Sequence, residues 1–218
     1  MRIMPLTYLL YRCPRCGHDP MEGEKDEALC PACATWFGRG GEGSLIRIRE
    51  SNGEEWEVPS RLLTASIQAL GGPGPRARDR EGRIRYEAEA EVRVAKEETP
   101  FRFRGELLGF AETLGAGVPG VLEITDEALT FSPTGAPESH SGSEELGRSW
   151  PLLDIRAVQT SSSSLQISPR EGGLVQFRFR LDSPRRWEEL LHLVLREAYR
   201  GAGLGEITEF QPRISAGP

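Results

Sequence analysis

The 218-residue chain has no long hydrophobic run, only two lysines, Lys25 and Lys96, and no strongly basic block. No stretch approaches the roughly 20 apolar residues that a transmembrane helix needs, so we expect no membrane span. The apolar start, 1–10, is short and no small-residue cleavage site follows it, so we expect no signal peptide. Arginine supplies the other positive charges, and the formal net charge is -6. This balance lacks the electrostatic footprint of a nucleic-acid-binding protein.

The chain also lacks the sequence signatures of common enzymes. A P-loop, a G-x-S-x-G nucleophile elbow and an H-E-x-x-H metalloprotease motif are all missing. The three histidines, His18, His140 and His192, are far apart in the sequence, and no cysteine lies outside one short cluster. We therefore expect no catalytic residues, no enzymatic activity and no small-molecule substrate.

The four cysteines form two C-x-x-C pairs, Cys13 with Cys16 and Cys30 with Cys33, with thirteen residues between the pairs. Two such pairs supply four sulfur ligands in a tetrahedron, which is the geometry of structural zinc sites. One pair alone would fit a redox dithiol or a disulfide, but two pairs favour a metal. Iron binds the same ligands; we expect one zinc ion. Four protein ligands leave no open position, so the site is expected to stabilise the fold and not to catalyse.

The cysteine motifs CPRCG and CPAC resemble the rubredoxin-type knuckles of a zinc ribbon. The resemblance covers roughly residues 8–58, and Ala34 stands where the family commonly has glycine. His18 is expected to be a solvated loop residue and not a ligand. Trp36 and Phe37 follow the last cysteine, and we expect them to form the small core of the ribbon instead of a stacking platform.

Turn and helix signals follow the cysteine segment. Alternating residues on both sides of Asn52-Gly53 predict a β-hairpin that completes the ribbon sheet. The segment 59–70 has apolar residues at helical spacing, with Ser60 as the expected N-cap. Glycines and prolines from residue 71 exclude regular structure and mark a linker. The predicted units are a zinc ribbon (1–58), a short helix and linker (59–83), a second domain (84–203) and a tail (204–218).

Short alternating segments dominate the second domain and predict an antiparallel sheet folded over its own core. These strands are 84–95, 101–104, 105–110, 121–125, 128–131, 150–158, 165–168 and 174–181. One helix closes the domain, with Ser183 as its N-cap and Pro184 as its first residue. An apolar stripe that includes Trp187, Leu190 and Val194 is expected to pack on the sheet. The predicted fold class is mainly β (α+β).

The run from Pro119-Gly120 through Ile124-Thr125 to Phe131, followed by Pro151-Leu152, resembles a GRAM or other pleckstrin-homology-like domain. The resemblance covers about residues 100–200. It implies a bent seven-stranded antiparallel sheet, capped at one corner by the C-terminal helix, that binds lipid head groups or proteins without catalysis. Lipid-binding members share a basic cluster near the loop between the first two strands. We place that loop at 113–119, which has no positive charge.

These observations lead to three hypotheses. The first is a cytoplasmic adaptor that joins a structural zinc ribbon to a protein-binding module, with an unidentified protein partner. The second is a protein peripheral to the membrane that contacts anionic lipid through arginines of the strands, each contributing about 1 kcal/mol. The arginines assigned to this contact are Arg102, Arg104, Arg178 and Arg180. The third is nucleic-acid binding by the ribbon, which the charge balance disfavours.

Overall fold

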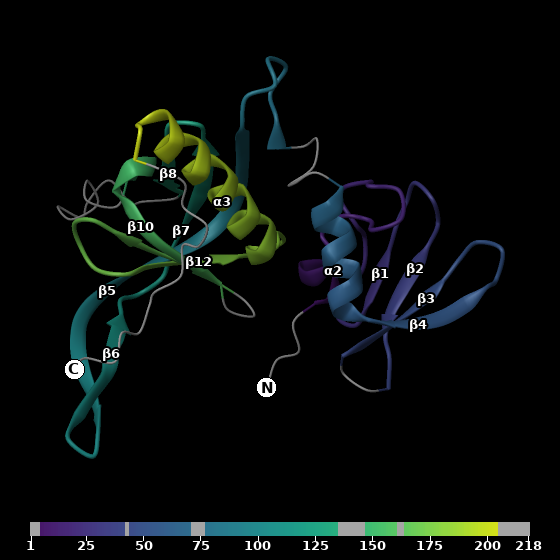
Figure 1. Ribbon diagram of the computed structural model, residues 1–218, viewed down its shortest axis with the longest axis horizontal. Coiled ribbons are helices and arrows are strands. Elements are labelled where there is room, and N and C mark those ends of the chain that lie inside the picture. Colours follow the sequence, from purple (N-terminus) through teal and green to yellow (C-terminus); the bar gives the residue numbers. More distant parts are fainter. Residues whose placement is uncertain (1–4, 42–43, 71–76, 135–146, 161–163, 205–218) are drawn as a thin grey trace.

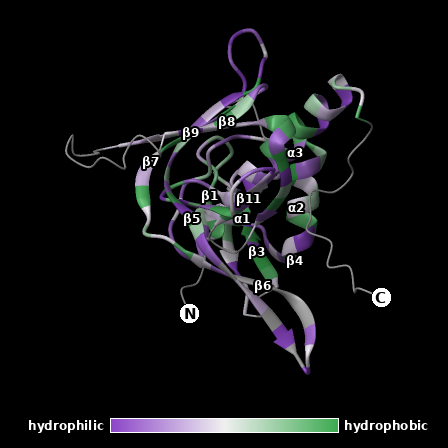
Figure 2. Ribbon diagram, turned by 90° about the vertical axis from the view of Figure 1, so that its left-hand side faces the viewer, coloured by the Kyte–Doolittle hydropathy of each residue, from purple (hydrophilic) through white to green (hydrophobic). Residues whose placement is uncertain are grey.

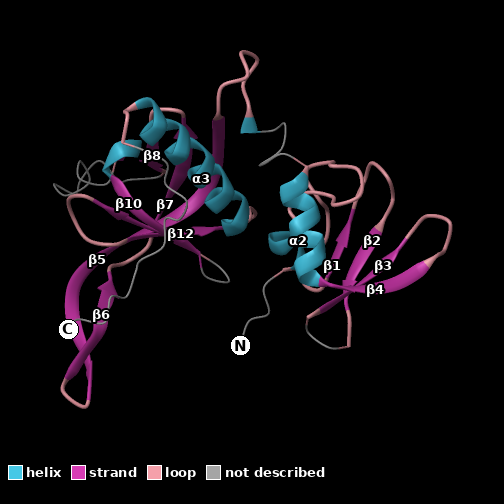
Figure 3. Ribbon diagram, in the orientation of Figure 1, coloured by secondary structure: helices cyan, strands magenta, loops and turns pink. Residues whose placement is uncertain are grey.

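The computed structural model describes residues 5–41, 44–70, 77–134, 147–160 and 164–204. The protein is mainly β and contains two antiparallel sheets, each with its own hydrophobic core (Figures 1 and 3). The predicted fold class is therefore confirmed. None of the helices in these ranges is long and apolar enough to cross a membrane. The predicted tail, 204–218, and most of the serine- and glycine-rich segment before Arg148 lie outside the described residues.

The first sheet has the strand order β1-β2-β3-β4 and is flanked by two helices. Its elements are α1 (Leu6–Leu9), β1 (Glu27–Leu29), β2 (Trp36–Arg39), β3 (Leu45–Arg49), β4 (Glu55–Pro59) and α2 (Ser60–Ala69). The predicted hairpin is present as β3 and β4. Its turn places Gly53 at φ +87°, where glycine avoids the clash that a Cβ causes. We refer to this four-stranded unit, described at residues 5–41 and 44–70, as the ribbon.

Helix α2 packs on the ribbon core. Leu63 and Ile67 of this helix are buried in the same cluster as Phe37 and Ile46, which are completely inaccessible to solvent. The prediction that Ser60 is the N-cap is wrong: Pro59 occupies that position, and Ser60 is the first helical residue. A proline side chain has no hydrogen-bond acceptor, so the helix begins without a side-chain cap.

The second sheet has the strand order β10-β11-β12-β5-β7-β8-β9, and β6 pairs with the distal half of β5. Its elements are β5 (Arg85–Phe103), β6 (Glu106–Leu114), β7 (Val118–Thr125), β8 (Ala128–Pro133), β9 (Arg148–Pro151), a 3-10 helix (Leu152–Asp154), β10 (Ile155–Thr160), β11 (Leu165–Pro169), β12 (Val175–Phe179) and α3 (Pro184–Gly201). Seven strands thus form a curled antiparallel sheet, and α3 covers it (Figure 1).

The β5–β6 hairpin is an arm that projects from this sheet (Figures 1 and 3). The proximal half of β5 pairs with β7 and β12, whereas residues 97–103 pair only with β6. Arg104 and Gly105 form the turn at the tip, both with positive φ. The segments predicted as separate strands at 101–104 and 105–110 are therefore the two sides of this tip. In chain order the first two of the seven strands are β5 and β7. The whole arm connects them, and not only the predicted 113–119 loop.

Helix α3 packs as predicted. The Ser183 Oγ accepts a 3.4 Å hydrogen bond from the Arg186 N–H, and Pro184 is the first helical residue. Trp187 is completely buried and stacks on Phe179, with ring centroids 5.1 Å apart. Figure 2 shows hydrophobic and hydrophilic segments alternating along α3, as expected of a helix with one buried face.

Gly120 of β7 gives a direct test of packing in the second sheet. A Cβ added at this position would lie 2.4 Å from both the Phe131 ring and the Ser132 carbonyl oxygen. Because the clash includes backbone, we expect Gly120→Ala to lower the free energy of unfolding by about 1–3 kcal/mol, measured by urea denaturation. Gly201→Ala is the matched control, since a Cβ there meets nothing within 4 Å. Equal stabilities of the two variants would contradict this packing.

Candidate metal centre

Two backbone turns of the same form carry the four cysteines. In the first, the Cys13 carbonyl accepts a bond from the Gly17 N–H at 2.9 Å, and the Cys13 N–H donates to the His18 carbonyl at 2.8 Å. In the second, the Cys30 carbonyl accepts from the Ala34 N–H at 2.9 Å. Gly17 and Ala34 both have positive φ, 77° and 55°. Ala34 thus adopts the conformation for which the ribbon family commonly uses glycine.

The turns bring the four predicted ligands, Cys13, Cys16, Cys30 and Cys33, into one cluster. All four sulfur atoms lie within 4.8 Å of one another. The Cys13–Cys33 and Cys16–Cys30 sulfurs are 3.7 and 3.6 Å apart. A tetrahedron with metal–sulfur bonds of ~2.3 Å has sulfur separations of about 3.8 Å, whereas a disulfide bond is about 2.05 Å long. The geometry therefore fits one tetrahedral metal ion and excludes disulfides in this arrangement.

The surroundings of the sulfurs differ. Burial raises the pKa of the Cys13 and Cys30 thiols, although N–H groups of their own turns oppose this shift. Burial also acts on Cys33, but hydrogen bonds from Thr35 and the neighbouring thiols outweigh it and lower its pKa to about 7. The Thr35 hydroxyl, 3.2 Å from the Cys33 sulfur, therefore supports the cluster. Sequence reasoning missed Thr35, and its position two residues after a ligand was the available signal.

Metal binding at this cluster must displace protons. The pKa values of Cys13 and Cys30 lie above neutrality in the folded site, and thiols of an unfolded chain are also protonated near pH 7. A lower pH therefore favours the metal-free form, and zinc affinity rises with pH. We expect more than about two protons released per zinc at pH 7, measured by calorimetry in buffers of different ionisation enthalpy. Release of one proton or none would contradict this thiol-based site.

The residues that flank the cluster differ in their surroundings. His18 contributes its backbone carbonyl to the first turn, and the cysteines are the only group among the described residues arranged to hold a metal. Phe37 is completely buried in the ribbon core. The prediction that Trp36 also belongs to this core is wrong: Trp36 is half-buried outside the cluster, and the guanidinium of Arg49 lies 4.7 Å from its ring centroid.

The four arginines assigned to an anionic surface do not form one patch. Arg102 and Arg104 lie at the tip of the arm, and Arg102 donates to the Gly105 carbonyl. Arg178 lies opposite Glu91 on β5, eleven positions before Arg102, which is up to roughly 36 Å along the strand. Arg180 is 3.7 Å from the Glu89 carboxylate. The two pairs thus occupy separate regions, and Arg178 and Arg180 each lie next to a carboxylate of β5.

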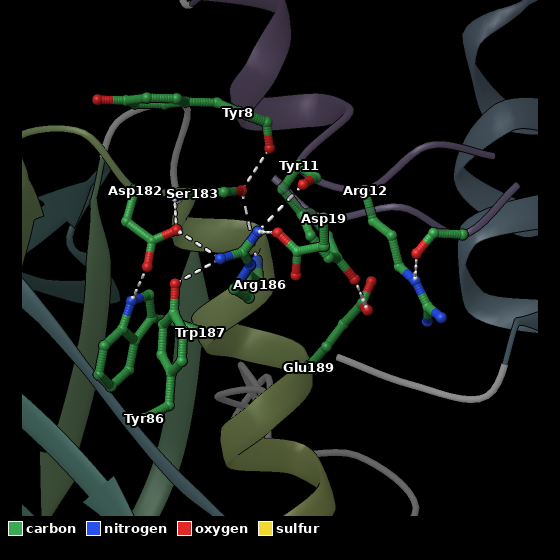
Figure 4. Close-up of polar contacts among 11 residues, drawn as sticks. Tyr8, Tyr11, Arg12, Asp19, Tyr86, Asp182, Ser183, Arg186, Trp187 and Glu189 are labelled. Carbon is green, nitrogen blue, oxygen red and sulfur yellow. Dashed lines mark hydrogen bonds and ion pairs between the residues drawn. The ribbon is translucent and has the colours of Figure 1, made fainter. Parts of the chain in front are cut away.

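A second polar cluster lies where the ribbon meets the second domain (Figure 4). At its centre is Arg186 of α3, which is only 2% exposed. Its guanidinium contacts Asp19 of the ribbon, Tyr86 of β5 and Asp182, whose carboxylate is 3.4 Å away. Burial raises the pKa of Tyr86 and of nearby Tyr11. One sequence signal of this burial was available: Arg186 lies one helical turn before Leu190 and therefore falls on the apolar stripe of the helix.

A cleft of about 590 Å³ adjoins this cluster. Ribbon residues, including Tyr8, Met21 and Lys25, form one wall. Glu89 of β5 and the segment from Arg180 to Ser183 form the other. Leu181 at this site is 88% exposed, the most exposed large hydrophobic residue among those described. The cleft thus combines apolar surface with charges of both signs.

Comparison with known proteins assigns no function to this site. No protein-family model matches the chain, and no curated protein is significantly similar to it.

Proposed function

We propose that the protein is a non-catalytic binding protein in which one structural zinc ion holds a ribbon and a second, pleckstrin-homology-like domain binds a protein partner. The cluster of four sulfurs at tetrahedral spacing carries this proposal. A metal held by four protein thiolates has no position for water or substrate, so it contributes to folding and not to catalysis. Cys13, Cys16, Cys30 and Cys33 would hold the ion.

Other titratable groups support a non-catalytic role. Outside the cysteines, strongly raised pKa values occur at Tyr11 and Tyr86. Both hydroxyls are hydrogen-bonded at the domain junction, Tyr11 to Glu189 and Tyr86 to Arg186. Shifted groups often mark active sites, but ion-pair networks within a protein shift them too. Here burial at the junction is the largest cause of both raised pKa values, so the shifts have a structural cause.

Metal analysis tests the first part of the proposal. The full chain, expressed in medium containing zinc and iron and purified without chelators, is expected to contain one zinc ion per chain. Both metals fit four thiolates, but an iron–thiolate centre absorbs visible light and zinc does not. Less than half an equivalent of total metal after reconstitution with excess zinc would contradict the proposal. Stoichiometric iron with visible absorption would show that the bound metal is iron and not zinc.

We assign the protein partner to the cleft, because a segment bound there would contact both domains and cover Leu181. Interaction sites combine apolar area with complementary polar groups. The experiment compares proteins captured from the native host by the full chain and by two variants. Leu181→Asp is expected to lose the enriched partner. Leu62→Asp on α2, at a position 52% exposed and outside the cleft, is expected to retain it. Equal capture by both variants would contradict this assignment.

The arm favours one alternative function, binding to an anionic membrane. Arg102 and Arg104 are exposed at its tip, and the arm connects the first two of the seven strands. In the resembling family, lipid-binding members carry basic residues in this region. If this alternative holds, vesicles containing anionic lipid will bind the protein at low salt, and the double variant Arg102→Glu/Arg104→Glu will not bind. This alternative would be excluded if the wild-type protein and the double variant bound neutral and anionic vesicles equally.

A further inference from the structure

One nitrogen of Arg186 joins the second domain to both sides of the first cysteine turn. Its Nη2 donates to the Tyr11 carbonyl at 3.0 Å and to the Asp19 carboxylate. Two acceptors can share one donor nitrogen only if they lie within about 6 Å of each other, twice a hydrogen-bond length. Tyr11 and Asp19 are eight residues apart in sequence, and Cys13 and Cys16 lie between them. The folded turn therefore creates the acceptor pair that Arg186 binds (Figure 4).

Other contacts between the two units come from the same ribbon segment. The Ser183 hydroxyl at the start of α3 donates to the Tyr8 carbonyl, and the Tyr11 hydroxyl donates to Glu189. The Tyr8 hydroxyl donates to the Phe179 carbonyl at 3.3 Å. The residues that contact the second domain thus lie just before and just after the first pair of ligands.

The charges at the junction make these contacts depend on one another. The side chains of Arg186 and Asp19 are 3% and 0% exposed, so each is a buried charge whose desolvation must be offset by its partner. Asp182 is 3.4 Å from Arg186 and belongs to the second domain, so it remains when the ribbon is absent. While the domains stay docked, truncating Arg186 or Asp19 would leave its partner as a buried charge with less compensation.

We propose that metal binding at the four cysteines controls the docking of the ribbon on the second domain, with Arg186 as the residue that senses the metal-organised turn. In the metal-bound protein the turn presents the Tyr11 carbonyl and Asp19 together, and Arg186 locks the two domains. Loss of the metal frees the backbone between Tyr11 and Asp19, the acceptor pair separates, and the domains part. The cleft lined by both domains is then lost. This inference rests on the proposed metal site.

The experiment follows hydrogen exchange in the second domain while metal is removed from the ribbon. In the zinc-loaded full chain, peptides that cover 84–90 and 179–190 are expected to exchange slowly. Chelation of zinc should raise exchange at least about tenfold in these two regions. Exchange in β10 and β11, which lie away from the junction, should stay unchanged. Small-angle scattering should show a larger radius of gyration in the chelated protein.

Variants separate loss of docking from loss of ribbon structure. Zinc-loaded Arg186→Met is expected to retain one zinc ion but to show the fast exchange of the chelated wild-type protein at 84–90. Asp19→Ala, on the ribbon side, should produce the same exchange, and the double variant should add little to either single variant. Arg196→Met is the matched control on the same helix, because Arg196 is exposed and its Nε donates to the His192 carbonyl of its own helix.

The outcomes distinguish the inference from the proposed function. If the protein binds no metal, the proposed metal site fails and the inference fails with it. If zinc binds and chelation unfolds the ribbon, but exchange at 84–90 and 179–190 does not change, metal-controlled docking is wrong although the metal site stands. Slow exchange in zinc-loaded Arg186→Met would show that Arg186 does not lock the domains.

Discussion

Replacing Cys30 with serine is expected to abolish stoichiometric zinc binding and to unfold the ribbon while the second domain stays folded. Cys30 is buried within the ligand cluster, and a serine hydroxyl is a poor substitute for a thiolate. Apparent binding free energies of structural zinc sites are about 10–16 kcal/mol. A small hydrophobic core rarely supplies more than about 3–5 kcal/mol. Loss of the metal therefore outweighs what the ribbon core alone provides.

The measurement is hydrogen exchange by residue range, together with the zinc content of the purified variant. Exchange in β2 and β3, the central strands of the ribbon sheet, is expected to approach that of an unfolded chain. Exchange in β7 and β8 should remain slow, because those strands belong to the other core. Ser66→Ala on α2 serves as the control, since Ser66 is exposed and its hydroxyl donates to the Leu62 carbonyl of the same helix. One tightly bound zinc ion in Cys30→Ser would refute the four-ligand site.

Local sequence signals predicted much of the fold and the metal cluster. The spacing of the cysteines was sufficient because two short turns determine the ligand positions with little help from distant residues. The Asn52-Gly53 turn and the Ser183-Pro184 helix start were predictable for the same reason, since the turn or cap depends on neighbouring side chains. Each of these features is encoded within a few residues, and the tertiary fold reinforces it.

Features that depend on distant partners were not predictable. Separate strands were predicted at 84–95 and 101–104, but β5 continues through the gap between them, which contains Pro100. Here β5 pairs with β6 alone, and the missing N–H of a proline is tolerated at a sheet edge. The arm therefore continues through a position where a strand end was expected. Arg186 lies on the apolar stripe of α3. An arginine in such a stripe usually lies at the edge of the buried face, but Arg186 is buried. Its burial requires Asp19, which is 167 residues away in the sequence.

Truncation of Trp187 is expected to be the most damaging single change in the second domain. The side chain is completely buried between Tyr86 and Phe179, with ring centroids 5.4 and 5.1 Å away, and its Nε1 donates to Asp182 at 2.9 Å. Trp187→Ala removes this contact area and leaves a cavity, so the free energy of unfolding should fall by about 3–5 kcal/mol. Asp182 would also lose a donor while it still faces Arg186.

Urea unfolding followed by far-ultraviolet circular dichroism measures this loss, with zinc in excess so that the ribbon stays folded. Trp187→Phe should cost less than the alanine variant, because it keeps an aromatic ring against Phe179 and loses only the indole N–H and part of the volume. Leu181→Ala is the control: its side chain is 88% exposed, so the change should stay within about 0.5 kcal/mol. A loss below about 1 kcal/mol in Trp187→Ala would mean that α3 does not close the core of the second sheet.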